Sequence, residues 1–394
     1  MTRRLISDVD RRCLRSLLWN GAFKGGRSVR AFRKRIKTTG SIFPPFLFIS
    51  ITNDCNLACQ GCWVTRSDPP RYMAPELLDS IVNKAKKQKK ASVFGILGGE
   101  PLLWEGLIDF FEKHRDAYFI LFTNGLLLDD TFCAKLRKLG NVTPLISIEG
   151  DAQASDRRRG GKGVYEASAR ALDACRRNKL FTGVATSVCR SNISFVMSSY
   201  FISSLESMGV HHLWYYIYRP VGERPQPELA LDAKQITDLR EFLVEIRRKT
   251  PMVIIDAYWD AEGNPVCPAA AGISHHINPD GFIEPCPPIQ FADMRLEEGN
   301  HELCSLFDSG ALNSFREFAG GSNGSCVLME KPGELAGFLD KPGVVDTSGR
   351  AGFGDELAAM EPAPSHSSAI RIPEKHWLYR MAKKNWFCGF GAYG

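Results

Sequence analysis

The chain has 394 residues and a formal net charge of +6, and 44% of its residues are hydrophobic. This composition excludes a disordered or low-complexity protein and is typical of a soluble globular chain with a large core. We find no apolar run long enough for a transmembrane helix and no signal-peptide core, so we expect a cytoplasmic protein. In that reducing compartment the twelve cysteines are expected to bind metal rather than to form disulfides.

Residues 1–43 form a basic N-terminal extension in which apolar side chains lie between the charges. The cations are Arg3, Arg4, Arg11, Arg12, Arg15, Lys24, Arg27, Arg30, Arg33, Lys34, Arg35 and Lys37, and the apolar residues include Leu17, Leu18, Trp19 and Phe23. We expect a helical extension that packs its leucines on the rest of the protein. Peripheral contact with an acidic membrane surface or an acidic partner is the other interpretation.

From Pro44-Pro45 to residue 250, apolar runs alternate with helical patterns. Strands are predicted at 46–51, 93–97, 118–122, 144–148, 182–188 and 213–218, and helices at 75–90, 104–114, after a cap at Asp129, and at 164–178, 194–208 and 232–249. Six buried, non-alternating strands that are each followed by a helix predict parallel pairing with the helices outside. The predicted fold class is therefore α/β, with a partial (β/α)6 TIM-like barrel over residues 44–250, short of a closed eight-stranded barrel.

Three thiols lie close together on the loop that leaves the first strand. Cys55, Cys59 and Cys62 have the spacing C-x3-C-x2-C, which lets three thiolates hold three corners of a 4Fe-4S cube. The fourth iron would then be open, and an open metal position is one where chemistry takes place. A zinc site without its fourth ligand and three unrelated core thiols also fit this spacing.

Three more polar loops follow the carboxyl ends of predicted strands. They are Gly98-Gly99-Glu100-Pro101, Thr123-Asn124-Gly125 and Ser147-Ile148-Glu149-Gly150. Folds of this kind keep their sites at that end of the strands, so we expect these loops to converge on the cysteine loop.

Beyond residue 250 the pattern changes to short strands, prolines, glycines and separated cysteines. Residues 251–332 form a small cysteine-containing extension, in which Cys267 and Cys286 bracket a hairpin turn at Pro279-Asp280-Gly281 and Cys326 follows a glycine-rich run. Residues 333–394 are rich in Gly, Pro, Ala and Ser and are expected to be loosely ordered. Their aromatic stretches at 376–379 and 386–390 are expected to dock somewhere on the protein.

Taken together, the motifs of residues 44–250 resemble the radical S-adenosylmethionine (radical SAM) superfamily. The resemblance rests on the three spaced cysteines after the first strand, Gly98 to Pro101 after the second, and the six strand–helix units. It implies a 4Fe-4S cluster whose open iron binds S-adenosyl-L-methionine (SAM). It further implies reductive cleavage of SAM to a 5′-deoxyadenosyl radical, which abstracts a hydrogen atom from a substrate. We assign no side chain as a general acid or base, since this chemistry belongs to the cofactors.

The resemblance also implies which residues bind SAM. Gly98 and Gly99 would let the backbone approach the methionine part, and Glu100 would accept from its ammonium group. Ser147 and Glu149 would contact the ribose, with Thr123 and Asn124 as weaker candidates. One departure is Gly61, where the family often has an aromatic residue, which leaves Trp63 as the candidate for the adenine contact.

The second half resembles the auxiliary-cluster extensions called SPASM and twitch domains. Cys267, Gly281 and Cys286 fit their opening pattern, but the dense run of four cysteines of a full SPASM domain is absent. The resemblance implies a twitch-like domain with one auxiliary iron–sulfur cluster on Cys267, Cys286 and Cys326. The fourth position could be taken by Cys304, substrate or water, and ordinary buried thiols remain the other interpretation.

Expected partners follow from the same resemblance: an external electron donor of the flavodoxin or ferredoxin type, and a peptide, protein or small-molecule substrate. An iron–sulfur redox sensor or electron carrier is the alternative function, but it would have no reason to place Gly98 to Glu100, Ser147 and Glu149 beside a cluster. Nucleic acid is not an expected partner, because the basic run from Arg157 to Lys162 has no aromatic stacking partners. That run could instead meet an anionic substrate.

Overall fold

The computed structural model describes residues 2–297, 303–350 and 352–385. Its main sheet has nine strands in the order β7-β6-β5-β4-β3-β2-β1-β8-β9. The strands are β1 Phe46–Ser50, β2 Val93–Leu97, β3 Tyr118–Thr123, β4 Val142–Ser147, β5 Gly183–Val188, β6 His212–Ile217, β7 Val253–Ile255, β8 Ser274–Ile277 and β9 Ile283–Glu284. All neighbours from β7 through β1 to β8 pair in parallel, and only β9 is antiparallel. The predicted partial barrel is confirmed, and β7 and β8 extend it at its two edges.

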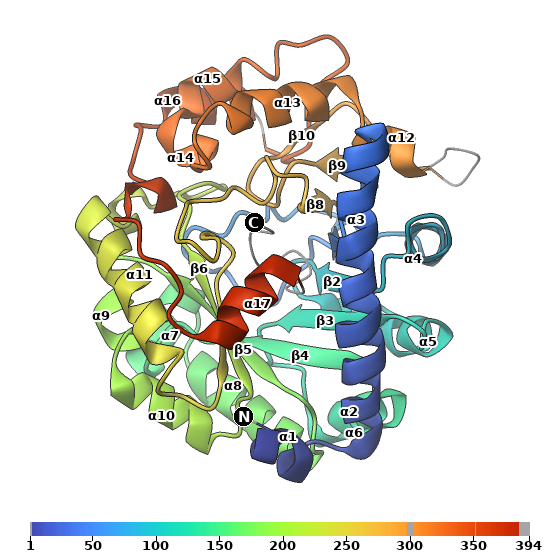
Figure 1. Cartoon of the computed structure of the whole chain (residues 1–394), viewed down its shortest axis with the longest axis vertical. Helices are drawn as coiled ribbons and strands as arrows, with labels where there is room; N and C mark the ends of the chain where they lie inside the picture. The colour runs from blue at the N-terminus through green and yellow to red at the C-terminus, as the bar shows by residue number, and fades with distance from the viewer. Residues whose placement is uncertain (1, 298–302, 351, 386–394) are drawn as a thin grey trace.

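Helices cover the outside of this curved sheet (Figure 1). Those that follow the strands are α4 Pro75–Lys89, α5 Leu107–Lys113, α6 Asp130–Leu139, α8 Val164–Arg177, α10 Ser199–Ser207 and α11 Ala233–Ile246, with α7 Ala152–Arg159 and α9 Ile193–Val196 as short additions. The predicted cap at Asp129 is confirmed, because its side chain accepts a hydrogen bond from the Phe132 amide. The strands are uniformly buried because helices cover one face and a second apolar cluster fills the other.

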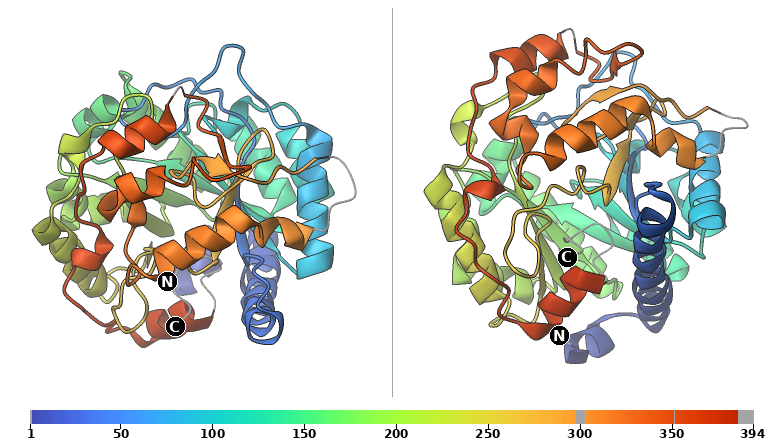
Figure 2. Two further views of the ribbon diagram at one scale, coloured as in Figure 1. Left: turned by 90° about the horizontal axis from the view of Figure 1, so that it is seen from above. Right: turned by 45° about the horizontal axis from the view of Figure 1, so that its top comes forward.

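The N-terminal extension is a helical column along one side of the barrel (Figures 1 and 2). The column comprises α2 Arg11–Ser16, a π-helix η1 Leu17–Lys24 and α3 Gly25–Thr39, and α1 Thr2–Asp8 lies at an angle below it in Figure 1. Its inner side buries Val29 in the same apolar cluster as the strand residues Phe46 and Tyr118. The column therefore closes part of the barrel interior.

The C-terminal region packs over the loops that follow β1 and β6. It contains α12 Leu303–Phe307, α13 Gly310–Gly320, α14 Val327–Glu330, α15 Pro332–Ala336, a two-stranded pair of β10 Phe291–Ala292 and β11 Val345–Asp346, α16 Phe353–Ala359 and α17 Trp377–Asn385. Arg350 donates to the Thr65 hydroxyl at 2.9 Å, and the Gly222 amide donates to Glu356 at 2.9 Å. The orange and red helices at the top of Figure 1 belong to this region.

The end of the chain differs from the loosely ordered tail that its composition suggests. Up to Asn385 it is packed, because two of its charged side chains, Glu374 and Lys383, are buried in an ion network. Their partners are Arg240, Arg247 and Asp256; Glu374 lies 2.8 Å from Arg240, and Lys383 lies 3.2 Å from Asp256. The predicted aromatic docking stretch at 386–390 lies outside the described residues. None of the described helices has both the length and the apolar character needed to cross a membrane.

Candidate active site

Three thiols of the loop after β1 line one cavity of about 200 Å³. Cys55, Cys59 and Cys62 share its wall with residues from the loops after β2, β3 and β4. These residues are Gly98, Gly99, Thr123, Asn124 and Ser147, all of which belong to the predicted site. Four of the loops that the sequence singles out therefore converge on one rim.

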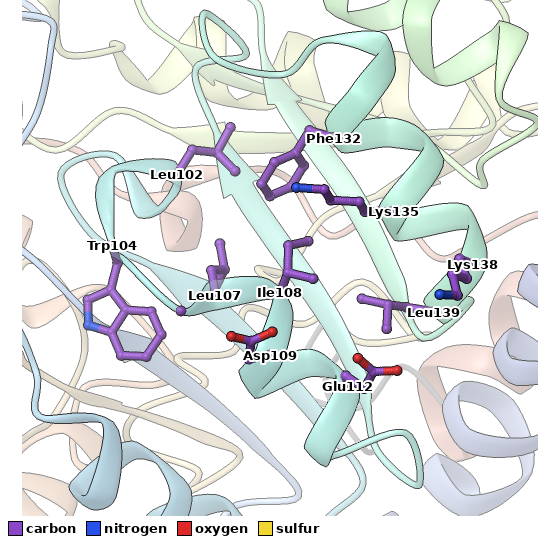
Figure 3. A pocket seen from close by; sticks show the side chains of 11 residues that line it. Leu102, Trp104, Leu107, Ile108, Asp109, Glu112, Phe132, Lys135, Lys138 and Leu139 are labelled. Carbon is purple, nitrogen blue, oxygen red and sulfur yellow. The ribbon is translucent and has the colours of Figure 1, made fainter.

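A larger hollow of about 430 Å³ lies elsewhere, on the outside of the barrel between α5 and α6 (Figure 3). Its wall has carboxylates on α5, from Asp109 and Glu112, and ammonium groups on α6, from Lys135 and Lys138. None of the three thiols lines it, so we place the candidate site at the smaller cavity.

The cysteine loop is held by backbone contacts with the loop after β2. The Gly99 amide donates to the Thr52 carbonyl at 2.9 Å, and the Glu100 amide donates to the Asp54 carbonyl at 2.7 Å. A Cβ atom on Gly99 would lie 2.1 Å from the Asp54 carbonyl oxygen, so no other residue fits there without moving the backbone. The glycine turn therefore allows the two loops to pack closely, in addition to the predicted approach of the methionine part of SAM.

The three cysteines are half-buried. Burial raises the pKa of Cys55 to about 11 and that of Cys62 to about 12, and neighbouring thiolates add to the effect. Among the described residues, no three His, Cys, Asp or Glu side chains are close enough to share a single metal ion. A 4Fe-4S cube does not need three ligands on a single metal ion, because each cysteine binds a different iron. Three thiols around one cavity fit that requirement.

Glu100 joins the loops after β2 and β3 rather than lining the cavity. It is fully buried, and its Oε1 accepts from the Leu102 amide at 3.1 Å and from the Thr123 hydroxyl at 2.7 Å. Its Oε2 accepts from the Asn124 amide at 2.8 Å. Burial raises the pKa of this carboxyl, and the three donors oppose that effect. Glu100 therefore positions Thr123 and Asn124, which do line the cavity.

Glu149 is also set back from the cavity, behind an arginine that was not among the predicted site residues. Its Oε1 pairs with Arg159 at 2.5 Å, and its Oε2 accepts from the Ser187 amide at 3.0 Å. Arg159 lines the cavity, and its Nη1 lies 3.9 Å from the Cys59 sulfur. Burial alone would lower the pKa of Arg159, but the charges of Glu149 and Cys59 raise it, so the guanidinium stays charged.

Arg159 reaches this position because α7 ends against the cysteine loop. The Gln60 amide donates to the Arg158 carbonyl at 2.8 Å, and a Cβ on the terminal residue Gly160 would lie 2.2 Å from the Ala58 carbonyl oxygen. The basic run was visible in the sequence. The pair between Arg159 and Glu149 could not be predicted from the sequence, because it depends on how α7 packs against the loop after β4.

A family profile with the description "Radical SAM superfamily" matches residues 49–190, the part of the chain that holds the cysteine loop and the loops around it. This match places a radical SAM domain at residues 49–190 of the chain.

Two curated relatives of the chain have different names. It is 23% identical over 226 residues to an Fe-coproporphyrin III synthase of Methanosarcina barkeri, covering 55% of this chain and 56% of that protein. It is 26% identical over 269 residues to the sporulation killing factor maturation protein SkfB of Bacillus subtilis, covering 65% and 62%. The chain thus spans about three fifths of the length of these relatives.

Among solved structures, Streptococcus suis SuiB bound to precursor peptide SuiA has the same fold. The TM-score is 0.59 with 14% sequence identity, and the match covers 73% of this chain and 70% of that one. At this identity the likeness concerns the fold alone.

The radical SAM loop has a glycine, Gly61, where an aromatic residue is common, and the structure gives a reason. Gly61 has φ +61°, and a Cβ there would lie 1.9 Å from the hydroxyl oxygen of Tyr218, which follows β6. The Tyr218 ring occupies that space and lies under the Arg158 guanidinium, 5.0 Å away. Trp63 lines the cavity and contacts His276 edge-on, with the ring centroids 5.3 Å apart. The adenine contact of Trp63 stays a prediction.

His276 belongs to a buried polar chain at the end of β1. Its Nε2 lies 2.7 Å from the Ser50 hydroxyl, and its Nδ1 lies 2.5 Å from Glu284. The other Glu284 oxygen accepts from Asn278 and from Thr347. These partners account for both nitrogens of His276, so its role here is to join β1 to β8 and β9.

The three cysteines proposed for an auxiliary cluster pack against one apolar cluster in the C-terminal region. Burial, with the charge of Cys326, raises the pKa of Cys267 to about 11, and burial also raises the pKa of Cys286. Half-buried Arg219, which no pattern in the sequence indicates, donates from Nε to the Cys326 sulfur at 3.2 Å. Cys304 lies in α12, and its side chain is outside the described part of the structure.

Proposed function

We propose that this protein is a radical SAM enzyme whose 4Fe-4S cluster is held by Cys55, Cys59 and Cys62. The observation that carries the proposal is that three half-buried thiols of one loop share a cavity wall with a glycine turn and polar side chains. When bound, the cluster supplies the electron that converts SAM into methionine and a 5′-deoxyadenosyl radical, which removes a hydrogen atom from the substrate. A sensor or electron carrier has no need of a ligand cavity beside its cluster.

The chain's own residues would bind and orient SAM. Gly98 and Gly99 offer backbone groups to its methionine part, and Arg159 offers a charged guanidinium to its carboxylate. Ser147, which lines the cavity with Thr123 and Asn124, would form a hydrogen bond with a ribose hydroxyl. Glu100 and Glu149 hold these groups in place through the bonds described above. We retain both carboxylates in the proposed binding set because either could exchange a partner for the ligand.

We further propose that the reaction is an oxidative modification, with a peptide or protein side chain as the substrate. The likeness to SkfB, named as a maturation protein, supports this substrate class, and the synthase relative keeps a small metabolite as the second candidate. Cys267, Cys286 and Cys326 would hold an auxiliary iron–sulfur cluster, with Arg219 as a hydrogen-bond donor to it. A second cluster could accept the electron that an oxidation releases, and a flavodoxin or ferredoxin would supply the first.

Below the SAM cavity, aromatic rings from three strands form the interior surface. Phe122 lines the cavity and contacts Phe48, Trp214 and Tyr216, at centroid distances of 5.8, 5.7 and 6.4 Å. The Tyr216 hydroxyl is buried without a hydrogen-bond partner in the described structure. An apolar or aromatic substrate group with one polar atom would fit these neighbours.

The test is anaerobic reconstitution with iron and sulfide, followed by reduction, addition of SAM and measurement of 5′-deoxyadenosine. The intact protein is expected to form it and the Cys59→Ala variant is not, while Cys189→Ala, at a cysteine outside both groups, keeps the activity. About eight irons per chain would agree with two cubanes and about four with one. A fully loaded protein that forms no deoxyadenosine and shows no spectral change with SAM would favour the sensor or carrier.

A further inference from the structure

The outward face of the N-terminal helical column exposes apolar side chains that the fold does not use. Leu18, Trp19 and Phe23 are 56%, 57% and 49% exposed, although the opposite side of the column is buried. Trp19 and Phe23 stack on each other, with ring centroids 4.8 Å apart. The aromatic pair is thus a preformed surface feature rather than two separately exposed residues.

The same face is basic throughout. Every charged residue between Asp10 and Asp54 is Arg or Lys. The exposed residues recur three or four positions apart and so form one stripe along the column: Arg15, Trp19, Phe23, Arg27, Arg30, Lys34 and Lys37. Within the described residues, no carboxylate forms an ion pair with Arg15, Arg30 or Lys34. A stripe of this length without acidic partners attracts an anionic surface.

We propose that this stripe binds the surface of an anionic lipid bilayer. Trp19 and Phe23, with Leu18 beside them, would enter the headgroup region, and the cations on either side would pair with lipid phosphates. Aromatic rings next to Arg and Lys are the combination that membrane interfaces favour.

Two contacts favour a bilayer over a single-stranded nucleic acid. Bases stack on open aromatic faces, but here Trp19 and Phe23 already cover one another and Arg27 lies 5.9 Å from the Phe23 centroid. The exposed aliphatic Leu18 also has no use in stacking with bases.

Neighbouring α17 can widen the membrane face. Arg33 of α3 donates to the Lys384 carbonyl of α17, and both helices lie on the same side of the barrel in Figures 1 and 2. α17 exposes Trp377 by 67% and Met381 by 51%. None of these residues lines the SAM cavity, so the proposed contact is independent of the proposed reaction.

The experiment is flotation of the full chain with vesicles of phosphatidylcholine alone or mixed with phosphatidylglycerol. Binding is expected only with the anionic vesicles and is expected to weaken at high salt. The Trp19→Ser/Phe23→Ser variant should lose binding. Arg15→Gln/Arg27→Gln/Arg30→Gln should lower the affinity roughly a hundredfold, since each cation near an anionic surface contributes about fivefold.

Controls carry changes at exposed positions away from the stripe: Tyr200→Ser at a single exposed aromatic residue, and Lys87→Gln/Arg170→Gln/Lys249→Gln for the charges. They should bind like the unchanged protein, and all variants should keep its melting temperature. The proposal is overturned if no vesicle binds, if neutral vesicles bind equally well, or if the stripe variants bind like the controls. Tighter binding to single-stranded RNA than to anionic vesicles would also overturn it.

Discussion

The two groups of half-buried cysteines differ in how the chain brings them together. Cys55, Cys59 and Cys62 come from one loop and open onto a cavity, whereas Cys267, Cys286 and Cys326 come from three separated segments and pack against apolar side chains. Each group has a half-buried arginine at one sulfur, Arg159 in the first and Arg219 in the second. A local motif therefore forms the site with room for a ligand, and the dispersed group depends on the packing of the C-terminal region.

We expect the largest effects from cysteine substitutions, which should change SAM cleavage in the first group and iron content in the second. Cys62→Ala should reduce deoxyadenosine formation to background, because the SAM-binding cluster loses a corner. Cys326→Ala should lose roughly four irons per chain yet keep SAM cleavage. Iron analysis and product quantification on the same reconstituted samples measure both. Equal iron in Cys326→Ala and the unchanged protein would remove the auxiliary cluster from the proposal.

Substitution of the two arginines should have different effects on stability and on SAM binding. Arg159→Gln leaves Glu149 buried without its cation, so the free energy of unfolding should fall by about 3–5 kcal/mol and SAM binding should weaken. Arg219→Gln removes a hydrogen bond to a sulfur and should cost less, about 1.5–3 kcal/mol. Urea unfolding and a spectral SAM titration measure the difference. If Arg219→Gln weakened SAM binding as much as Arg159→Gln, the assignment of separate roles would be wrong.

The packing of the tail against the barrel can be tested at the buried ion network. Glu374→Gln leaves Arg240, Arg247 and Lys383 with Asp256 alone, so the unfolding free energy should fall by about 3–5 kcal/mol. The exposed Glu361→Gln is the matched control and should change it little. Thermal or urea unfolding is the measurement.

The same network predicts an acid limit to stability. Burial alone would raise the pKa values of Asp256 and Glu374, but the charges of Lys383, Arg247 and Arg240 hold both below their ordinary 3.8 and 4.5. A lowered carboxyl pKa stabilises the fold fully above the ordinary value, and that stability is lost as the pH falls toward the folded value. Unfolding measured from pH 6 downward should therefore show a loss that begins near pH 4.5 and is smaller in Glu374→Gln.

The smallest effect is expected at Gly61, where the first group depends on a contact outside its own loop. Gly61→Ala places a Cβ against Tyr218 at a positive φ, and the backbone conformation alone should cost about 1–2 kcal/mol. Gly26→Ala in α3 meets no atom within 4 Å and is the control, expected to be neutral or stabilising. Melting temperature and iron retention distinguish the two variants.

Six strands were predictable because they are buried on both faces and are thus mostly apolar. β8 was not, since its two histidines, His275 and His276, are buried polar residues that interrupt any apolar run. The tail composition suggested loose order because ion pairs between Glu374 or Lys383 and distant residues leave no pattern in a single sequence.

By itself the sequence determined what lies within a few residues: the cysteine spacing, the glycine turn and the alternation of strands with helices, because short chain segments and strand periodicity fix those arrangements. Only the tertiary structure decided that Glu100 and Glu149 stand behind the cavity wall, that Arg159 lines it, and that Tyr218 fills the space above Gly61. It also placed Arg219 at the Cys326 sulfur. Each of these contacts joins residues from different loops, and their separation is set by how the elements pack.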